Sequence, residues 1–374
     1  MLFTCCVPTL FGLEGLTAKE LRRMDMPGVR AENGRVLFDG DFSQVMEANL
    51  RLRTGERVLI RLNEFPALEF EDLYQGVLSA PLEYFIPRDG AFPVKGHSLN
   101  SKLHSVPTCQ SIVKRAAAER LGKKYGLNRL PETGSLYQLQ FSIMKDHAEL
   151  FLDTSGPGLH KRGYRAVGND APLRETLAAA LVELARYRGK GVFLDPFCGS
   201  GTVAIEAAMT AKNRAPGLMR FFSCEKWAIS DKKQWQEARQ RCMDREFSGD
   251  YQIFASDIDP KSLAIARSNA KKAGMDKYIT FSEADARTLS LPEGPGVIVT
   301  NPPYGQRMLE QRQARDLLRD FGRHMKGVKD YDVNIISSEE ELERLYGRRA
   351  DKKRKLYNGM IKCDLYMFHR EGNK

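Results

Sequence analysis

The segment whose residues point most directly to a reaction is Thr300-Asn-Pro-Pro-Tyr-Gly305, which follows an apolar run over residues 297–300. Two consecutive prolines fix the backbone and remove two N–H donors, so the turn keeps free carbonyl oxygens. Asn301 adds a side-chain acceptor, and Tyr304 offers a flat ring on which a purine can stack. Together these groups can accept both hydrogens of an exocyclic amino group on a nucleobase.

An exocyclic amine of this kind is a poor nucleophile because its lone pair is delocalised into the ring. Acceptors that hold its hydrogens draw the nitrogen toward a tetrahedral form, which attacks an electrophile more readily. An activated methyl donor such as a sulfonium needs no strong base, so positioning and electrostatics supply most of the rate enhancement. We therefore predict amine methylation, with Asn301, Pro302, Pro303 and Tyr304 as the catalytic group.

A second segment, Leu194-Asp-Pro-Phe-Cys-Gly-Ser-Gly-Thr202, lies between a predicted strand and a predicted helix. Open α/β sheets bind nucleotides at junctions of this kind. Gly199 and Gly201 let the backbone approach a ligand closely, and the start of the helix offers unpaired N–H groups. Residues 199–204 also fit a loose dinucleotide-binding pattern, which leaves an NAD-dependent oxidoreductase as an alternative.

Acids that follow later strands could complete a nucleoside site. Asp257 ends a predicted strand and could accept both ribose hydroxyls in a bidentate hydrogen bond. Asp259 is the second choice, because an Asp at that position is better placed to cap the next helix. Asp285 could accept an adenine amino group, and a plain turn residue is an equal alternative there. The long gap between Gly201 and Asp257 indicates an insertion over residues 212–249.

The elements that must position these residues follow an α/β pattern in the C-terminal half. A predicted hairpin around Asn358-Gly359 would add an antiparallel strand to a mostly parallel sheet. The N-terminal half mixes shorter strands and helices, as small α+β units do. In the C-terminal half we expect strands at residues 192–195, 253–257, 279–283, 297–300 and 332–337, and helices at residues 172–187, 202–211, 260–273, 314–324 and 339–346.

Composition sets the wider limits. A chain of 374 residues with 42% apolar and 28% charged residues is typical of a globular protein of two or three domains. There is no apolar run of membrane-spanning length, and the N-terminus has no basic region of the kind that opens a signal peptide. The seven cysteines have neither disulfide-framework nor zinc spacing, so we expect reduced, buried cysteines and no metal. The net charge of +10 favours an anionic partner such as nucleic acid.

Five further motifs carry a family resemblance: Ser98-Leu-Asn-Ser-Lys-Leu-His104, Cys109-Gln-Ser-Ile-Val-Lys114, Asp153-Thr-Ser-Gly-Pro-Gly-Leu-His-Lys-Arg-Gly-Tyr-Arg165, Pro172-Leu-Arg-Glu-Thr-Leu-Ala178 and Arg214-Ala-Pro-Gly217. With the Asn-Pro-Pro-Tyr segment, they make the chain similar to THUMP-domain class I RNA methyltransferases of the large-subunit rRNA guanine-N2 methyltransferase L family. The resemblance extends over nearly the whole chain.

This resemblance implies an α/β fold in which α+β ferredoxin-like and THUMP domains precede a Rossmann-like class I methyltransferase domain. The expected boundaries are 1–55 for the ferredoxin-like domain, 56–155 for the THUMP domain, 156–170 for a linker and 171–374 for the methyltransferase domain. The implied cofactor is S-adenosyl-L-methionine. Its expected contacts are Asp195, Pro196, Phe197, Gly199, Gly201, Thr202, Asp257, Ile258, Asp285, Ala286 and Asn301, and the expected RNA contacts are Lys102, Lys114, Arg115, Lys161 and Arg162.

The resemblance also implies a substrate and a cellular setting. We expect methylation of a guanine N2 amine in 23S rRNA or a large-subunit assembly intermediate, in the cytoplasm and without a membrane. In some family members a second methyltransferase half follows, and we expect its activity to be absent here. Three alternatives stay open beside the NAD enzyme: a tRNA guanine-N2 methyltransferase, a DNA adenine-N6 methyltransferase and a non-catalytic RNA-binding assembly factor.

Overall fold

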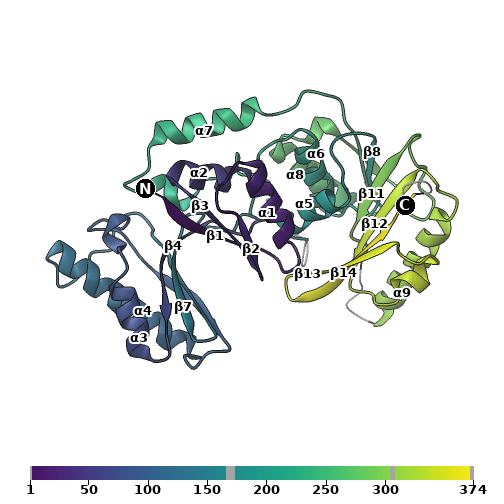
Figure 1. Ribbon diagram of the computed structural model, residues 1–374. Helices are drawn as coiled ribbons and strands as arrows, with labels where there is room; N and C mark the ends of the chain where they lie inside the picture. The colour runs from purple at the N-terminus through teal and green to yellow at the C-terminus, as the bar shows by residue number, and fades with distance from the viewer. Residues whose placement is uncertain (1, 166–172, 304–307, 371–374) are drawn as a thin grey trace.

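The computed structural model describes residues 2–165, 173–303 and 308–370. Within these ranges the strands form two seven-stranded sheets, one from each half of the chain. Figure 1 shows the N-terminal half as two bodies at the left and centre and the C-terminal sheet at the right. No helix in the described ranges is long and apolar enough to cross a membrane. All seven cysteines are buried thiols, as expected from their spacing.

The N-terminal sheet has the order β2-β3-β1-β4-β7-β6-β5. Its strand β4 pairs with β1 on one side and with β7 on the other, both antiparallel. The two α+β units expected from the sequence therefore share one continuous sheet. The elements are β1 (Phe3–Pro8), α1 (Glu14–Arg23), β2 (Arg30–Glu32), β3 (Arg35–Gly40), α2 (Phe42–Arg51), β4 (Leu59–Pro66), α3 (Phe70–Leu78), β5 (Val94–Leu99), α4 (Val106–Tyr125), β6 (Leu139–Met144) and β7 (His147–Asp153).

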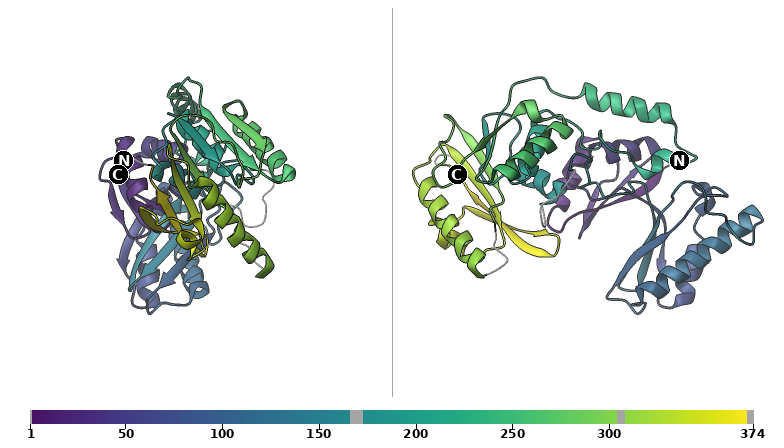
Figure 2. Two further views of the ribbon diagram at one scale, coloured as in Figure 1. Left: turned by 90° about the vertical axis from the view of Figure 1, so that its right-hand side faces the viewer. Right: turned by 180° about the vertical axis from the view of Figure 1, so that it is seen from behind.

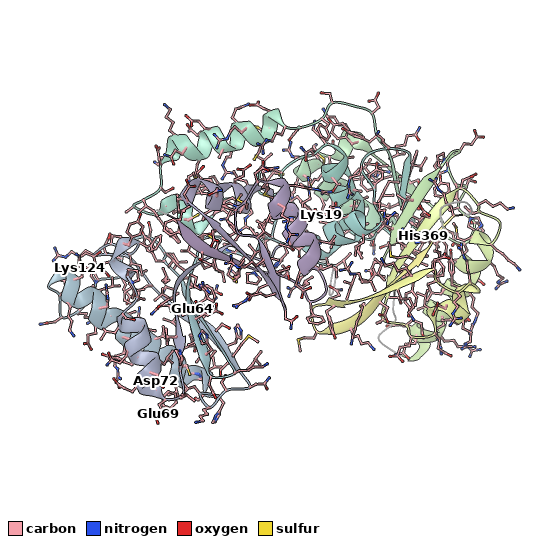
Figure 3. All side chains as sticks on the ribbon, viewed as in Figure 1. Lys19, Glu64, Glu69, Asp72, Lys124 and His369 are labelled. Atoms are coloured by element: carbon pink, nitrogen blue, oxygen red, sulfur yellow. The ribbon has the colours of Figure 1, made fainter. Side chains whose placement is uncertain are left out.

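Local sequence signals explain where these helices begin and end. Asp41 and Gln44 form a reciprocal capping box at the start of α2, which satisfies two N–H groups of the first turn. Helix α4 ends at Tyr125, and its C-cap Gly126 has φ of +63°, a conformation that glycine adopts without steric strain. Figure 3 places Lys124 near this end of α4 and Glu69 and Asp72 at the opposite end of the same body. The acids there begin α3, where the helix dipole favours negative charge.

The C-terminal sheet has the order β10-β9-β8-β11-β12-β14-β13. Its first five strands are parallel, and β14 then pairs antiparallel with β12, which confirms the expected α/β sheet with a terminal hairpin. Buried residues on both faces give it three layers. The elements are α5 (Glu175–Leu184), β8 (Val192–Asp195), α6 (Thr202–Ala211), α7 (Lys232–Asp244), β9 (Gln252–Asp257), α8 (Pro260–Ala273), β10 (Ile279–Glu283), β11 (Gly296–Thr300), α9 (Met308–Met325), β12 (Tyr331–Ser337), α10 (Leu342–Tyr346), β13 (Lys352–Asn358) and β14 (Ile361–Phe368).

The expected insertion over residues 212–249 does not pack on the sheet from which it emerges. Its helix α7 lies along α2 of the N-terminal body, as Figures 1 and 2 show from opposite sides. Trp227 of the insertion stacks on Tyr137 with ring centroids 5.1 Å apart, and its indole N–H donates to the carbonyl of Leu136. Arg220 donates to the carbonyls of Gly158 and Lys161. The insertion thus adds side chains of the C-terminal half to the hydrophobic core of the N-terminal half.

Candidate active site

The two segments with chemical potential meet at the carboxyl edge of the C-terminal sheet. Strands β8 and β11 are parallel neighbours, and they end at Asp195 and Thr300 respectively. The Thr300 hydroxyl donates to the Asp195 carboxylate at 2.7 Å. This bond joins the glycine segment to the Asn-Pro-Pro turn. Asn301 is half-buried, Pro302 is buried and Pro303 is exposed, whereas Tyr304 lies outside the described residues.

Asp195 is almost completely enclosed, with 1% of its surface exposed. Burial raises its pKa to about 7, although the Thr300 hydroxyl and the Phe197 N–H both donate to the carboxylate and lower the pKa. The nearby Asp257 carboxylate raises the pKa further. The carboxyl group of Asp195 therefore titrates near neutral pH, at the end of β8 and before the glycines.

The glycine segment leaves room beside its backbone. Gly199 has φ of +50° and no heavy atom within 4 Å of the place where a Cβ would be, so the space next to it is open. Gly201 has φ of +80°, and a Cβ there would lie 3.0 Å from the Cβ of Ala266 on α8. Gly199 therefore lets a ligand approach the backbone, whereas Gly201 lets α8 pack closely against the start of α6. Helix α6 begins at Thr202 after Gly201, which has no side chain to accept a hydrogen bond from the N–H groups of the first turn.

Asp257 and Asp259 have different tasks. The Asp257 carboxylate accepts hydrogen bonds from the Gly199 N–H at 2.8 Å and the Asp259 N–H at 3.0 Å. It therefore lies against the glycine segment. Asp259 caps α8 by accepting from the N–H groups of Lys261 and Ser262, at 3.1 Å each. Asp259 is therefore engaged as a helix cap, and Asp257 stays the predicted ribose acceptor. The intervening Ile258 is exposed.

Asp285 and Ala286 follow β10 at the same edge of the sheet. Arg287 donates through Nε and Nη2 to both Asp285 oxygens, at 2.9 and 2.6 Å. These bonds lower the pKa of Asp285 and hold its carboxylate in one orientation. Ala286 is buried in the core beneath. Pro196 is likewise buried, and Phe197 packs edge-on against Phe321 with ring centroids 5.3 Å apart.

Sequence reasoning missed Arg165 as part of this site. It donates to the hydroxyl of Thr202 at 2.7 Å and to the carbonyl of Leu173 at 3.0 Å, and its Nε lies 3.4 Å from Glu175. The sequence placed Arg165 only in a basic segment between domains. Nothing in its spacing from Thr202 indicates a contact, because 36 residues, including α5 and β8, separate the two in the chain.

The five residues predicted to contact RNA differ in how far their side chains are exposed to solvent. Lys102, Arg115 and Lys161 are exposed, although the Arg115 guanidinium lies 4.7 Å from the centre of the Tyr74 ring. Lys114 is paired with Glu132 at 2.6 Å and lies 3.5 Å above the Phe92 ring, so its ammonium group is already engaged.

Arg162 requires a correction, because only 2% of it is exposed and a phosphate cannot reach it. Its guanidinium donates to the carbonyls of Leu159 at 2.8 Å and Leu52 at 3.3 Å, and it lies 3.4 Å from Glu206. Arg162 is therefore a structural residue that ties the segment after β7 to α6.

Comparison with known protein families decides the class. A family described as "RMKL-like, methyltransferase domain" matches residues 162–367, which is more than half of the chain. An RlmL ferredoxin-like domain matches residues 4–59, and a THUMP domain matches residues 67–153. The chain belongs to the RlmL-like methyltransferase family. The predicted order of ferredoxin-like, THUMP and class I methyltransferase domains is confirmed.

Two relatives of the methyltransferase extend over nearly all of it. YpsC of Bacillus subtilis (strain 168), an RNA methyltransferase candidate, is 41% identical over 98% of this chain and 96% of its own length. Ribosomal RNA large subunit methyltransferase K/L of Psychromonas ingrahamii is 34% identical over 96% of this chain. The chain spans about half of that second protein, 49% of its length.

Solved structures agree. SMU.472, a methyltransferase candidate complexed with SAH, is 36% identical to this chain and superposes with a TM-score of 0.93. The alignment covers 100% of this chain and 99% of the SMU.472 chain. A predicted N6-adenine-specific DNA methylase from Listeria monocytogenes is 41% identical, with a TM-score of 0.94. The alignment covers 99% of this chain and 97% of the methylase chain. TrmN from Thermus thermophilus shares the fold, at 22% identity and a TM-score of 0.71. The alignment covers 99% of this chain and 100% of the TrmN chain.

S-adenosylmethionine is the cofactor of the methyltransferase, as the sequence predicted. The open backbone at Gly199 and the Asp257 carboxylate beside it fit an adenosyl group, because they offer close approach and a hydroxyl acceptor at one place. The described residues contain no group of three or more His, Cys, Asp or Glu side chains that could hold a metal ion.

Proposed function

We propose that this methyltransferase transfers a methyl group to the exocyclic N2 amine of a guanine in large-subunit rRNA. The observation that carries the proposal is the Thr300–Asp195 hydrogen bond, which holds the Asn-Pro-Pro turn beside the glycine segment at one edge of the sheet. An amine acceptor and a methyl donor site must be neighbours for direct transfer. The THUMP match and the two RNA-directed relatives support RNA as the substrate class.

Within this proposal, the chain holds both reactants through a few groups. Asp257 accepts the ribose hydroxyls, and Asp285, fixed by Arg287, accepts the adenine amino group. When bound, S-adenosylmethionine supplies an electrophilic methyl group on a sulfonium. Asn301 accepts one hydrogen of the target amine through its side chain, while the Pro302 carbonyl accepts the other. Tyr304 supplies a ring face for a base swung out of its stack.

The amine site gives a first prediction. Asn301→Ala should lower the rate of methyl transfer by about 10²–10³-fold, because it removes one preorganised acceptor that strengthens as the nitrogen becomes tetrahedral. Binding of S-adenosylmethionine should change little. Tyr304→Phe, the matched control, should keep much of the activity because the ring face is retained. Single-turnover assays with rRNA measure both, and a near wild-type rate for Asn301→Ala would remove this turn from the mechanism.

The substrate is tested by incubation of the protein with labelled S-adenosylmethionine and, separately, rRNA, tRNA and DNA. We expect label in rRNA and, after digestion, in N2-methylguanosine by mass spectrometry. Label in tRNA alone would favour the tRNA alternative. Label in DNA adenine would favour the activity after which the Listeria monocytogenes relative is named.

A further inference from the structure

A cavity lies near the active site and shares Arg165 with it, whereas none of the residues assigned above to the cofactor or the amine lines it. Its volume is about 680 Å³, and it opens where the segment after β7 meets the start of α5 and the beginning of the insertion. Five cationic side chains and one carboxylate line it: Lys161, Arg162, Arg165, Arg174, Arg220 and Glu175. We call this cavity the linker pocket. Its excess of positive charge suits an anionic ligand.

The charges of the linker pocket are held in different ways. Arg162 and Arg174 are paired with Glu206 and Glu56, at 3.4 and 3.1 Å. Arg220 is buried, and its guanidinium donates to backbone carbonyls rather than to a carboxylate of the described residues. Lys161 is exposed, and its ammonium group has no hydrogen bond or ion pair among the residues that the structure describes. Among the described residues, the pocket therefore has fixed positive walls and one free cation, Lys161, at its surface.

An aromatic side chain stands at the border of the linker pocket. Phe221 is 79% exposed, although the next residue, Phe222, is buried against Trp235. The Arg239 guanidinium lies 5.7 Å from the centre of the Phe221 ring. An exposed phenyl ring costs free energy in water unless a partner covers it. A ring beside cations is the combination with which proteins hold single-stranded nucleic acid, since bases stack on the ring and phosphates meet the cations.

The linker pocket adjoins the cofactor segment through one side chain. Arg165 lines the pocket and donates to Thr202, the residue that begins α6 directly after the glycines. Glu175, at the first turn of α5, lines the pocket too and pairs with the same arginine. A ligand in the linker pocket therefore lies next to the edge of the sheet where methyl transfer is proposed.

We propose that the linker pocket binds a nucleotide that neighbours the target nucleotide in the RNA strand. Phe221 stacks on the base of that nucleotide, and Lys161 contacts its phosphate. The assignment rests on the proposed function for RNA as the substrate class. The proposal adds Phe221, a residue of the insertion, to the RNA contacts predicted in the THUMP domain, such as Lys102 and Arg115.

The test compares two single-stranded RNA probes of twelve nucleotides, one with mixed bases and one with abasic sugars throughout. Phe221→Ala should weaken binding of the mixed-base RNA by about 5- to 100-fold, the range expected for one lost stacking contact, and leave binding of the abasic RNA unchanged. Phe221→Trp should restore affinity. Phe247→Ala is the matched control. Phe247 belongs to the same insertion and is 58% exposed, but it lies close to the start of β9 and does not line the linker pocket.

Lys161→Gln tests the phosphate contact. It should reduce the slope of log affinity against log salt by about one for both probes, whereas Lys233→Gln, an exposed lysine on α7, should not. Equal weakening of both probes by Phe221→Ala, or none, would overturn the stacking role. Neither measurement involves methyl transfer, so a failure of the guanine-N2 assignment would appear in the nucleoside analysis and leave these results unaffected.

Discussion

At the residue scale, Asp257 is the side chain on which cofactor affinity should depend most. It already accepts the Gly199 N–H, so its carboxylate is fixed before a ligand arrives. Asp257→Ala should weaken S-adenosylmethionine binding by roughly 1.5–3 kcal/mol, as for a lost hydrogen bond to a charged group. Asp259→Ala is the control, since it removes the cap of α8 and should lower the free energy of unfolding by about 1 kcal/mol. Calorimetry that shows unchanged affinity for Asp257→Ala would exclude it from the site.

Asp195 makes a prediction about pH. Its pKa of about 7 in the folded protein exceeds the value near 3.9 expected in the unfolded chain. Its contribution to the free energy of unfolding is therefore full below pH ~4, and it is lost as pH rises toward and through 7. Asp195→Asn has no such loss, so its stability relative to wild type should rise between pH 5 and 7.5. Urea denaturation at several pH values measures the difference, and a constant difference would contradict the shifted pKa.

At the element scale, Arg162 holds the segment after β7 against α6 and the residues that follow α2. Removal of one partner of a buried ion pair leaves the other charge uncompensated. Arg162→Ala should therefore lower the free energy of unfolding by about 3–5 kcal/mol, because Glu206 is also buried. Lys161→Ala, one residue earlier and exposed, should change it by less than about 0.5 kcal/mol. Similar urea midpoints for the two variants would show that Arg162 does not tie these elements together.

At the scale of the whole molecule, the insertion fixes how the two halves of the chain meet. Trp227 contacts Tyr137, Phe85 and Phe42, which belong to three different parts of the N-terminal half. Its indole also bonds to the Leu136 carbonyl at 2.9 Å. The insertion, which belongs to the methyltransferase half, therefore packs on the THUMP body through Trp227. The THUMP body and the ferredoxin-like body share one continuous sheet.

Trp227→Ala should loosen this attachment without touching the cofactor segment. We expect a loss of about 3–5 kcal/mol in stability and faster amide hydrogen exchange at Leu136 and Tyr137. Trp235→Ala is the matched control: Trp235 is equally buried but stacks on Phe222 within the insertion. It should cost similar stability and leave exchange at residues 136–137 slow. Fast exchange there in both variants would contradict a specific role for Trp227.

The sequence by itself determined the identity of the cofactor and the bounds of several elements of the C-terminal sheet. Strands β8 and β10 and helices α6 and α8 begin and end where the pattern predicts, because local signals set such boundaries: strand-ending acids, positive-φ glycines, and Pro260 in the first turn of a helix. The Asn-Pro-Pro turn could be interpreted from residue types alone, since its acceptors are consecutive in the chain. Asp259 as a cap was foreseeable for the same reason.

Only the tertiary structure decided which distant residues share a surface. Arg162 was predicted to contact phosphate because it lies in one of the motifs that carry the family resemblance, but burial beside Glu206 makes it structural. The short strand β2 and the helix of the insertion were not predicted, and packing on the N-terminal body determines their place. Arg165 reaches Thr202, and Phe221 reaches the linker pocket, across long separations in sequence. Such contacts follow from how sheets and insertion pack, and no local pattern encodes them.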